Sequence, residues 1–176
     1  FMAAMHEVMA RRPNAHVVIV GEERVAYGAK LPEGESWKKR MLAQFAFDES
    51  RLHFTGLLPR NLYLQVLQAS SAHVYLTVPF VLSWSMMEAM SAGCLVVGSD
   101  TEPVRELITD GENGRHVDFY DVRAIANVIV EALEAPGKFA TMRAAARQTI
   151  LARYAASDIY ARKARLFSGD EVFPPA

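Results

Sequence analysis

The feature that most constrains the fold of this chain is a short apolar run, rich in β-branched residues, that ends in glycine. The first two such runs are residues 16–21 (HVVIVG) and 52–56 (LHFTG). Three further runs cover residues 72–77, 94–99 and 115–117. Continuous apolar runs of this length are typical of strands in a parallel sheet that is covered on both faces. The sequence therefore predicts several buried, parallel strands.

Segments with helical spacing of apolar residues separate these runs. They cover residues 2–11, 37–46, 59–69, 83–92, 103–108 and 121–133. Ser36 and Asp121 stand where N-cap residues are expected. Alternating strands and helices predict parallel strands joined by right-handed crossovers. We therefore expect an α/β fold with a Rossmann-like, doubly wound parallel sheet.

The chain has 176 residues, enough for one well-cored domain, and no internal repeat divides it. Residues from about 138 onward form an alanine- and arginine-rich helical pattern with a break near Ala156, followed by a loose tail at Pro174. We expect a single domain over residues 1–176, of which about 138–176 is a helical extension. Because the chain begins at Phe1 rather than methionine, we expect it to be part of a longer protein.

Net charge, cysteine content and the length of apolar runs bear on the partners and the location of this protein. The formal net charge is −1, so nothing predicts nucleic acid as a partner. The single cysteine, Cys94, lies in an apolar run and is expected to be a small buried hydrophobe. No apolar run approaches the roughly 20 residues that span a bilayer, and no signal peptide is visible. These features favour a cytoplasmic location.

The candidate ligand site lies at the carboxyl ends of the predicted strands, where open parallel sheets bind their ligands. Gly21, Gly56 and Gly98 and the segment 78–80 stand at these ends. Glycine allows a ligand to lie against the backbone. Tight turns explain the same glycines, so this pattern alone does not separate the two roles.

The segment 83–85 (SWS) begins the helix that follows the third strand. Backbone N–H groups and the positive end of the helix dipole make such a start suitable for phosphate. The alternative is simple capping by Ser83.

Glu88 lies one turn further along this helix, among Met86, Met87, Ala89 and Met90. These neighbours predict a helix that is buried nearly all round, in which a carboxylate needs a partner. A carboxylate at this place can accept two hydrogen bonds from a ribose diol. A solvated helix glutamate is the alternative.

Other kinds of site have no motif in this chain. The five histidines are dispersed, and none has metal-ligand spacing with another histidine, cysteine or carboxylate pair. No phosphate-binding loop, dinucleotide-binding glycine motif or nucleophile elbow occurs. We therefore expect no metal and no such cofactor.

Several segments of the chain resemble sequence motifs of one known family. Residues 86–100 (MMEAMSAGCLVVGSD) look like the LEAMAxGxPVVASD segment of group 1 (family 4) retaining glycosyltransferases. Residues 102–114 resemble the segment that follows it in that family, and residues 17–21 and 51–56 resemble two upstream strand segments. The resemblance covers roughly residues 1–135, in the family's order and spacing.

The resemblance implies the C-terminal half of a GT-B fold, in which two Rossmann-like domains face each other across a cleft. The C-terminal domain binds the nucleotide-sugar donor, and this chain is similar to that domain only. The family's first strand, the basic Arg and Lys pair that follows it and the acceptor-binding N-terminal domain have no match here. Residues 157–167 are similar to the segment that crosses back to that N-terminal domain. Without the N-terminal domain, this helix is expected to pack differently, dimerise or swap.

The resemblance also implies roles for particular residues. Glu88 matches the second glutamate of the family's E-x7-E motif, which binds the donor ribose, whereas Phe80 replaces the first glutamate, which contacts the transferred sugar. The positions expected to contact the donor are Gly21, Gly56, Leu58, Phe80, Ser83, Trp84, Ser85 and Glu88. No catalytic residue is assigned within these residues.

The implied activity is transfer of a hexosyl group from a nucleotide diphosphate sugar to an unknown acceptor, with retention and without a metal. The 176 residues alone are expected to be inactive, and the missing N-terminal domain could associate the full protein with a membrane. Two alternatives stay open: a nucleotide-sugar epimerase on the same scaffold, and a non-catalytic interaction domain, which the replacement at Phe80 favours.

Overall fold

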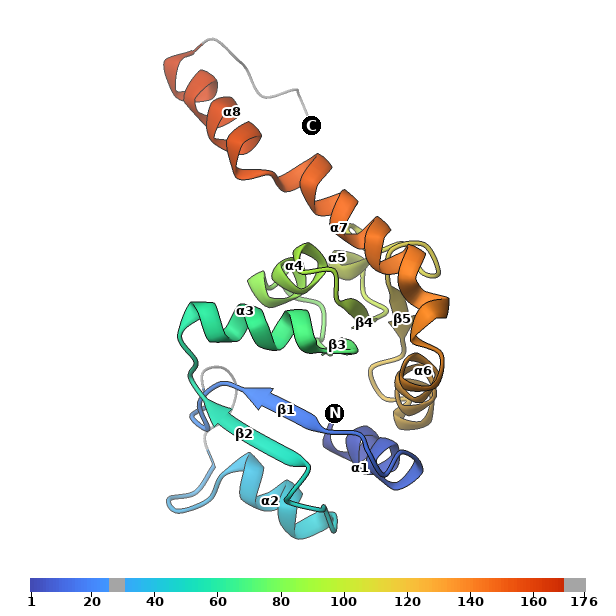
Figure 1. Ribbon diagram of the computed structural model, residues 1–176. Coiled ribbons are helices and arrows are strands. Elements are labelled where there is room, and N and C mark those ends of the chain that lie inside the picture. Colours follow the sequence, from blue (N-terminus) through green and yellow to red (C-terminus); the bar gives the residue numbers. More distant parts are fainter. Residues whose placement is uncertain (26–30, 170–176) are drawn as a thin grey trace.

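The computed structural model describes residues 1–25 and 31–169, which form an α/β body and a projecting helix (Figure 1). Its strands are β1 (Val17–Val20), β2 (Leu52–Gly56), β3 (Ala72–Tyr75), β4 (Leu95–Ser99) and β5 (Arg115–Val117). All neighbouring strands run parallel, in two hydrogen-bonded sheets of order β1-β2 and β3-β4-β5. The predicted α/β class with parallel strands is confirmed.

The hydrogen-bonded ladder is divided between β1 and β3, which differs from the single sheet expected. Each of these strands is at an end of its own sheet. Within the described residues, no strand pairs with both of them. The two sheets nevertheless share one core, because Val17 of β1 and Val97 of β4 belong to the same buried cluster. Partly buried residues of β3, Ala72 and Val74, pack against that cluster.

The helices follow the predicted order with small shifts at their ends. They are α1 (Met2–Arg11), α2 (Trp37–Gln44), α3 (Arg60–Ala69), α4 (Trp84–Ser91), α5 (Glu102–Arg105), α6 (Val122–Glu134), α7 (Ala140–Tyr154) and α8 (Ala156–Ser168), with a 3-10 turn at Pro136–Phe139. Both predicted caps are present: Ser36 Oγ accepts from the Lys39 N–H at 3.1 Å, and Asp121 Oδ1 accepts from the Ala124 N–H at 2.8 Å. α5 ends earlier than expected, although the N–H of Ile108 still bonds to the carbonyl of Val104.

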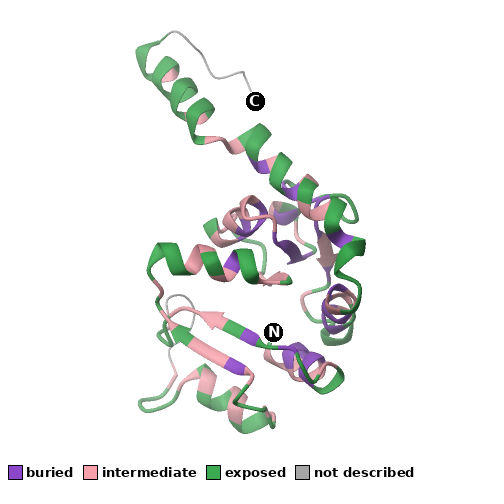
Figure 2. Cartoon of the chain, in the orientation of Figure 1, coloured by how far each residue is buried: buried purple, intermediate pink, exposed green. Residues whose placement is uncertain are grey.

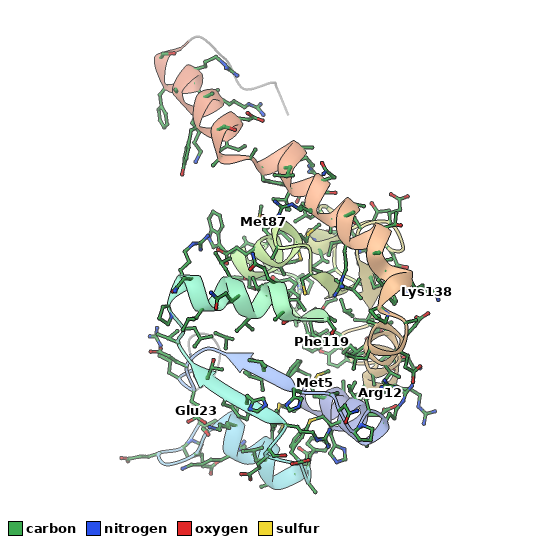
Figure 3. All side chains as sticks on the ribbon, viewed as in Figure 1. Met5, Arg12, Glu23, Met87, Phe119 and Lys138 are labelled. Atoms are coloured by element: carbon green, nitrogen blue, oxygen red, sulfur yellow. The ribbon has the colours of Figure 1, made fainter. Side chains whose placement is uncertain are left out.

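Strand β4 forms the centre of the body. All five of its residues are buried, because it lies between β3 and β5 and is covered on both faces (Figure 2). Leu95 and Val97 face one cluster, together with Met5 of α1 (Figure 3), whereas Val96 faces the other, together with Met86 and Met90 of α4. The continuous apolar pattern thus reports burial on both faces, as predicted.

The helical extension breaks at Ala155, close to the predicted position, where the backbone leaves helical geometry. α7 packs on the body through Ala146 and Ile150. α8 has no buried residue and projects away from the body (Figures 1 and 2). The predicted tail at Pro174 lies outside the described residues. Within residues 1–25 and 31–169, no helix is long and apolar enough to cross a membrane.

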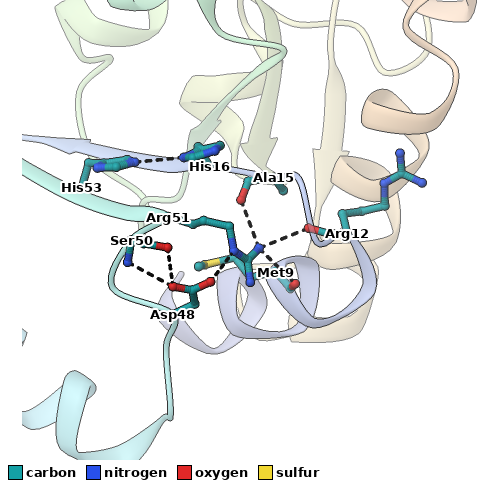
Figure 4. Close-up of polar contacts among 8 residues, drawn as sticks. All are labelled: Met9, Arg12, Ala15, His16, Asp48, Ser50, Arg51 and His53. Carbon is teal, nitrogen blue, oxygen red and sulfur yellow. Dashed lines mark hydrogen bonds and ion pairs between the residues drawn. The ribbon is translucent and has the colours of Figure 1, made fainter.

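Arg51, which immediately precedes β2, ties the turn between α1 and β1 to the second strand (Figure 4). Its Nη1 donates to the carbonyl oxygens of Met9, Arg12 and Ala15 at 3.2–3.3 Å. Its Nε donates to Asp48 Oδ2 at 2.8 Å, and this bond is the main reason that the pKa of Asp48 falls to about 2. One side chain therefore satisfies several backbone groups that β pairing leaves open.

We expect Arg51→Met to lower the free energy of unfolding by about 1–2 kcal/mol, because it removes charge-assisted hydrogen bonds from a side chain that is only 18% exposed. Urea denaturation measures this change. Arg40→Met is the matched control, since Arg40 pairs with Glu35 on the surface and is 43% exposed. Its effect should stay below about 1 kcal/mol. Equal effects of the two substitutions would contradict the role given to Arg51.

His73 of β3 makes stability depend on pH. Burial lowers the pKa of its imidazole from 6.5 to about 4, and its Nε2 is buried without a hydrogen-bond partner in the described part of the chain. Between these two pH values the unfolded chain binds more protons than the folded chain, so acidification favours unfolding. We expect the free energy of unfolding to fall by about 3 kcal/mol through this group between pH 7 and pH 4.

Urea denaturation at several pH values, on the natural chain and on His73→Gln, measures this contribution. The variant has no imidazole at this position and should lose that part of the pH dependence. Identical pH profiles for the two proteins would show that His73 does not contribute.

Candidate functional site

The start of α4 is built by two serines and a tyrosine. Ser83 Oγ accepts from the Ser85 N–H at 3.2 Å and lies 2.9 Å from Ser85 Oγ. The N–H of Ser83 donates to Tyr75 Oη, at the end of β3, at 3.2 Å. Capping by Ser83 is therefore confirmed. Two of the three backbone donors expected to face phosphate, those of Ser83 and Ser85, have partners within the protein.

Glu88 lies on the half-buried side of α4, with 20% of its side chain exposed. A partner for Glu88 was expected, and the structure shows that it is Arg60, the first residue of α3: Arg60 Nη1 donates to Glu88 Oε1 at 2.5 Å. Met86, Ala89 and Met90 are fully buried on the other side of α4. The expectation that α4 is buried nearly all round is wrong at Trp84, which is 79% exposed because it lies at the open start of the helix.

Tyr63 completes the surroundings of Glu88. It follows Arg60 by three residues on α3 and packs against the cluster that contains Met86 and Met90 of α4. Burial first, and then the negative charge of Glu88, raise the pKa of Tyr63 to about 12. A phenol is protonated at neutral pH in any case and can act as a hydrogen-bond donor.

Arg60 and Tyr63 were not predicted as site residues. One signal was present in the sequence: Arg60 stands in the first turn of its helix, next to Pro59, where a cation is disfavoured by the helix dipole. A cation kept in an unfavourable place suggests a nearby anion. The sequence could not identify Glu88 as that anion, because the two residues are 28 positions apart.

The other predicted contact residues lie in the loops that follow β2 and β3. Leu58 is partly buried in the short connection between β2 and α3, two residues before Arg60. Phe80 lies between β3 and α4 and is 57% exposed. Both loops lead into the helices that meet at Glu88, so the fold brings these segments to one end of the strands.

Gly21 and Gly56 meet at the carboxyl ends of β1 and β2. The N–H of Gly21 donates to the carbonyl of Gly56 at 2.9 Å. Gly56 has φ +65°, a conformation that a side chain disfavours, so the turn itself requires glycine there. Both glycines line a cavity of about 430 Å³ together with Phe54 and two ion pairs, Glu22–Arg24 and Glu23–Lys38. Glu88 does not line this cavity.

The predicted site residues thus form two groups, one at the glycines and one at α4. In a nucleoside diphosphate, the ribose hydroxyls can donate hydrogen bonds to a carboxylate, and the phosphate oxygens can accept them from cations. The structure provides the carboxylate at Glu88 with Arg60 on the α4 side. On the glycine side it provides Arg24 and Lys38, each of which is paired with a glutamate, Glu22 and Glu23 respectively.

Cys94, His16 and His53 lie outside these two groups of residues. Cys94 is 1% exposed, which confirms the predicted small buried hydrophobe, and burial raises the pKa of its thiol to about 11. His16 and His53, which no sequence motif links, stack across β1 and β2 with ring nitrogens 3.0 Å apart (Figure 4). No group of three or more His, Cys, Asp or Glu residues that could hold a metal ion occurs in residues 1–25 and 31–169.

Comparison with protein families gives a match over most of the chain. The family described as glycosyl transferases group 1 matches residues 1–149. A comparison with curated proteins gave no match.

Solved structures show the same fold. Anabaena Alr3699/HepE in complex with UDP-glucose has 21% sequence identity and a TM-score of 0.78, with 94% of this chain and 44% of that chain covered. The C-terminal domain of the group 1 glycosyl transferase LpcC from Francisella tularensis has 19% identity and a TM-score of 0.74, with 89% and 78% covered. Sucrose-phosphate synthase from Thermosynechococcus elongatus has 20% identity and a TM-score of 0.75, with 96% and 41% covered.

These likenesses establish the fold as that of the C-terminal domain of GT-B glycosyltransferases, including its Rossmann-like organisation. The chain spans less than half of the HepE and sucrose-phosphate synthase chains.

Proposed function

Because this chain belongs to the group 1 glycosyl transferases, we propose that it is the donor-binding domain of a transferase that uses a nucleotide diphosphate sugar. The observation that carries this proposal is the Glu88 carboxylate, held on α4 directly behind the serine-capped helix start. The HepE structure was solved with UDP-glucose, which supports a nucleotide sugar as the donor class.

In the proposed complex, Glu88 accepts hydrogen bonds from the ribose hydroxyls, and the start of α4 faces the diphosphate. Trp84 and Phe80 flank that position, and Gly21, Gly56 and Leu58 approach the rest of the nucleotide through their backbones. Transfer of a hexosyl group with retention needs stabilisation of charge on the departing diphosphate, which helix starts and basic side chains supply without a metal. We therefore propose no metal cofactor for this step.

The divided sheet supports a place for this domain in a longer protein. β1 and β3 are both ends of parallel sheets, and both contribute residues to one core or pack against it. Val18 of β1 is 42% exposed, although continuous apolar strands of this kind are usually buried. We propose that an additional parallel strand in the longer protein lies between β1 and β3 and joins the two sheets.

The projecting helix α8 supports a second contact in the longer protein. It has no buried residue, and Tyr160 and Phe167 are 69% and 91% exposed. We propose that this helix packs on the acceptor-binding domain, and that the 176 residues alone do not catalyse transfer because half of the cleft lies elsewhere. Dimerisation or exchange of α8 between copies is the corresponding proposal for the isolated domain.

Calorimetric titration of the full-length protein with UDP, GDP and ADP tests the proposed function. We expect one of these nucleotides to bind, and the corresponding nucleotide sugar to be consumed when an acceptor is present. Absence of binding by every nucleotide diphosphate and nucleotide sugar would sink the proposal. Product analysis separates transfer from release of a free, altered sugar, which an epimerase would give.

A non-catalytic interaction domain is the second candidate, and Phe80 favours it. An apolar ring, 57% exposed, stands where relatives carry a carboxylate for the transferred sugar. Failure of the full-length protein to turn over any nucleotide sugar, together with loss of nucleotide binding, would favour this candidate.

A further inference from the structure

The side chains around Glu88 carry an inference that rests on the proposed function and goes further into its site. Glu88 is attached to α4, but its hydrogen-bond partner belongs to α3. Arg60 donates to Oε1 at 2.5 Å, and Tyr63, one turn further along α3, packs against the cluster that contains Met86 and Met90 of α4. A carboxylate has room for about four hydrogen bonds, so these contacts leave acceptor positions for a ligand.

We propose that Arg60 and Tyr63 are positioning residues that fix the Glu88 carboxylate for the hydroxyl groups of a nucleoside diphosphate. Both residues act through Glu88, from one face of α3.

The location of Arg60 favours this role over simple surface pairing. Its side chain is 72% exposed, whereas Glu88 is 20% exposed, so the guanidinium covers the half-buried acid from the solvent side. Arg60 also stands in the first turn of α3, where the helix dipole disfavours a cation, and Pro59 gives that helix no side-chain cap. The contact with Glu88 compensates for that unfavourable position.

The charge of Arg60 has a second consequence for an anionic ligand. An unpaired carboxylate would repel a diphosphate that approaches it. A guanidinium hydrogen-bonded to the carboxylate offsets this repulsion while it holds the carboxylate in one orientation. Tyr63 offers a neutral donor, because a phenol keeps its proton at neutral pH.

A double-mutant cycle on the full-length protein tests the inference, with affinity for the nucleoside diphosphate that binds best as the measured quantity. We expect Arg60→Met and Tyr63→Phe each to weaken binding about three- to tenfold, less than the loss of a direct hydrogen bond to a charged group, because both residues act through Glu88. Arg60→Lys keeps the charge and should restore part of the loss. In the Glu88→Ala background, Arg60→Met should have almost no further effect, because a residue that acts through Glu88 is coupled to it.

Arg12→Met is the matched control. Arg12 forms an exposed bridge between helices, to Glu134 at 3.1 Å, and lies at the end of α1, apart from Met87 of α4 in Figure 3. This variant should bind the nucleotide like the natural protein. Thermal unfolding of every variant shows whether a loss of affinity reflects a loss of folding.

The outcomes are distinct. Additive effects of Arg60→Met and Glu88→Ala, or an unchanged affinity in both α3 variants, would overturn the inference while the nucleotide site stands. Failure of the natural protein to bind any nucleoside diphosphate would instead overturn the proposed function itself, and this inference with it.

Discussion

Replacing Glu88 with alanine is expected to weaken binding of the nucleotide diphosphate by about 1–3 kcal/mol, which is roughly 5- to 150-fold in affinity. The physical reason is the loss of an ionised acceptor, since hydrogen bonds to a charged group contribute more than those between neutral groups. Glu88 is half-buried and already oriented by Arg60, so it needs little rearrangement to receive a hydroxyl pair. Calorimetric titration of the full-length variant measures the change.

The control for this prediction is Glu134→Ala, which removes a glutamate of similar kind from an exposed ion pair at the end of α6. Its affinity for nucleotide should equal that of the natural protein. Glu88→Gln keeps the shape but not the charge, and an intermediate loss is expected. An unchanged affinity in Glu88→Ala, with the variant folded, would remove this carboxylate from the site.

Leu95→Ala is expected to lower the free energy of unfolding by about 2–5 kcal/mol. Leu95 begins β4, is 1% exposed and packs in the cluster shared by both sheets. Alanine leaves a cavity there, and β4 cannot close it, because hydrogen-bonded neighbours hold the strand on both sides. Urea denaturation measures the loss.

Leu151→Ala provides the comparison, because Leu151 of α7 is 44% exposed and its removal leaves little cavity. A change below about 1 kcal/mol is expected for this variant. A similarly small effect of Leu95→Ala would show that the shared core is not the main source of stability for this body.

Much of the fold followed from local patterns, for reasons visible in particular elements. β4 is apolar at every position because both of its faces are covered. Ser36 and Asp121 were identifiable as caps because a short acceptor before a helical pattern satisfies free N–H groups. The break before α8 was less sharply placed, since nothing beyond composition marks Ala155.

In the candidate site too, some features could be predicted from the sequence and others could not. Glu88 could be singled out from the sequence, because an acid among methionines on a short helix needs a partner. The partner itself could not be found, since the contact between Arg60 and Glu88 joins two helices across the sequence. His16 and His53 show the same limit: only the pairing of β1 with β2 places them together.

The amino-acid sequence by itself determined the alternation of strands and helices, the buried strand pattern and the acid at the centre of the site, because each depends on neighbours within a few residues. Only the tertiary structure decided which groups surround that acid and where the sheet divides. Both depend on contacts between distant segments: α3 reaches α4 at Glu88, and β1 and β3 contact one core without pairing with each other.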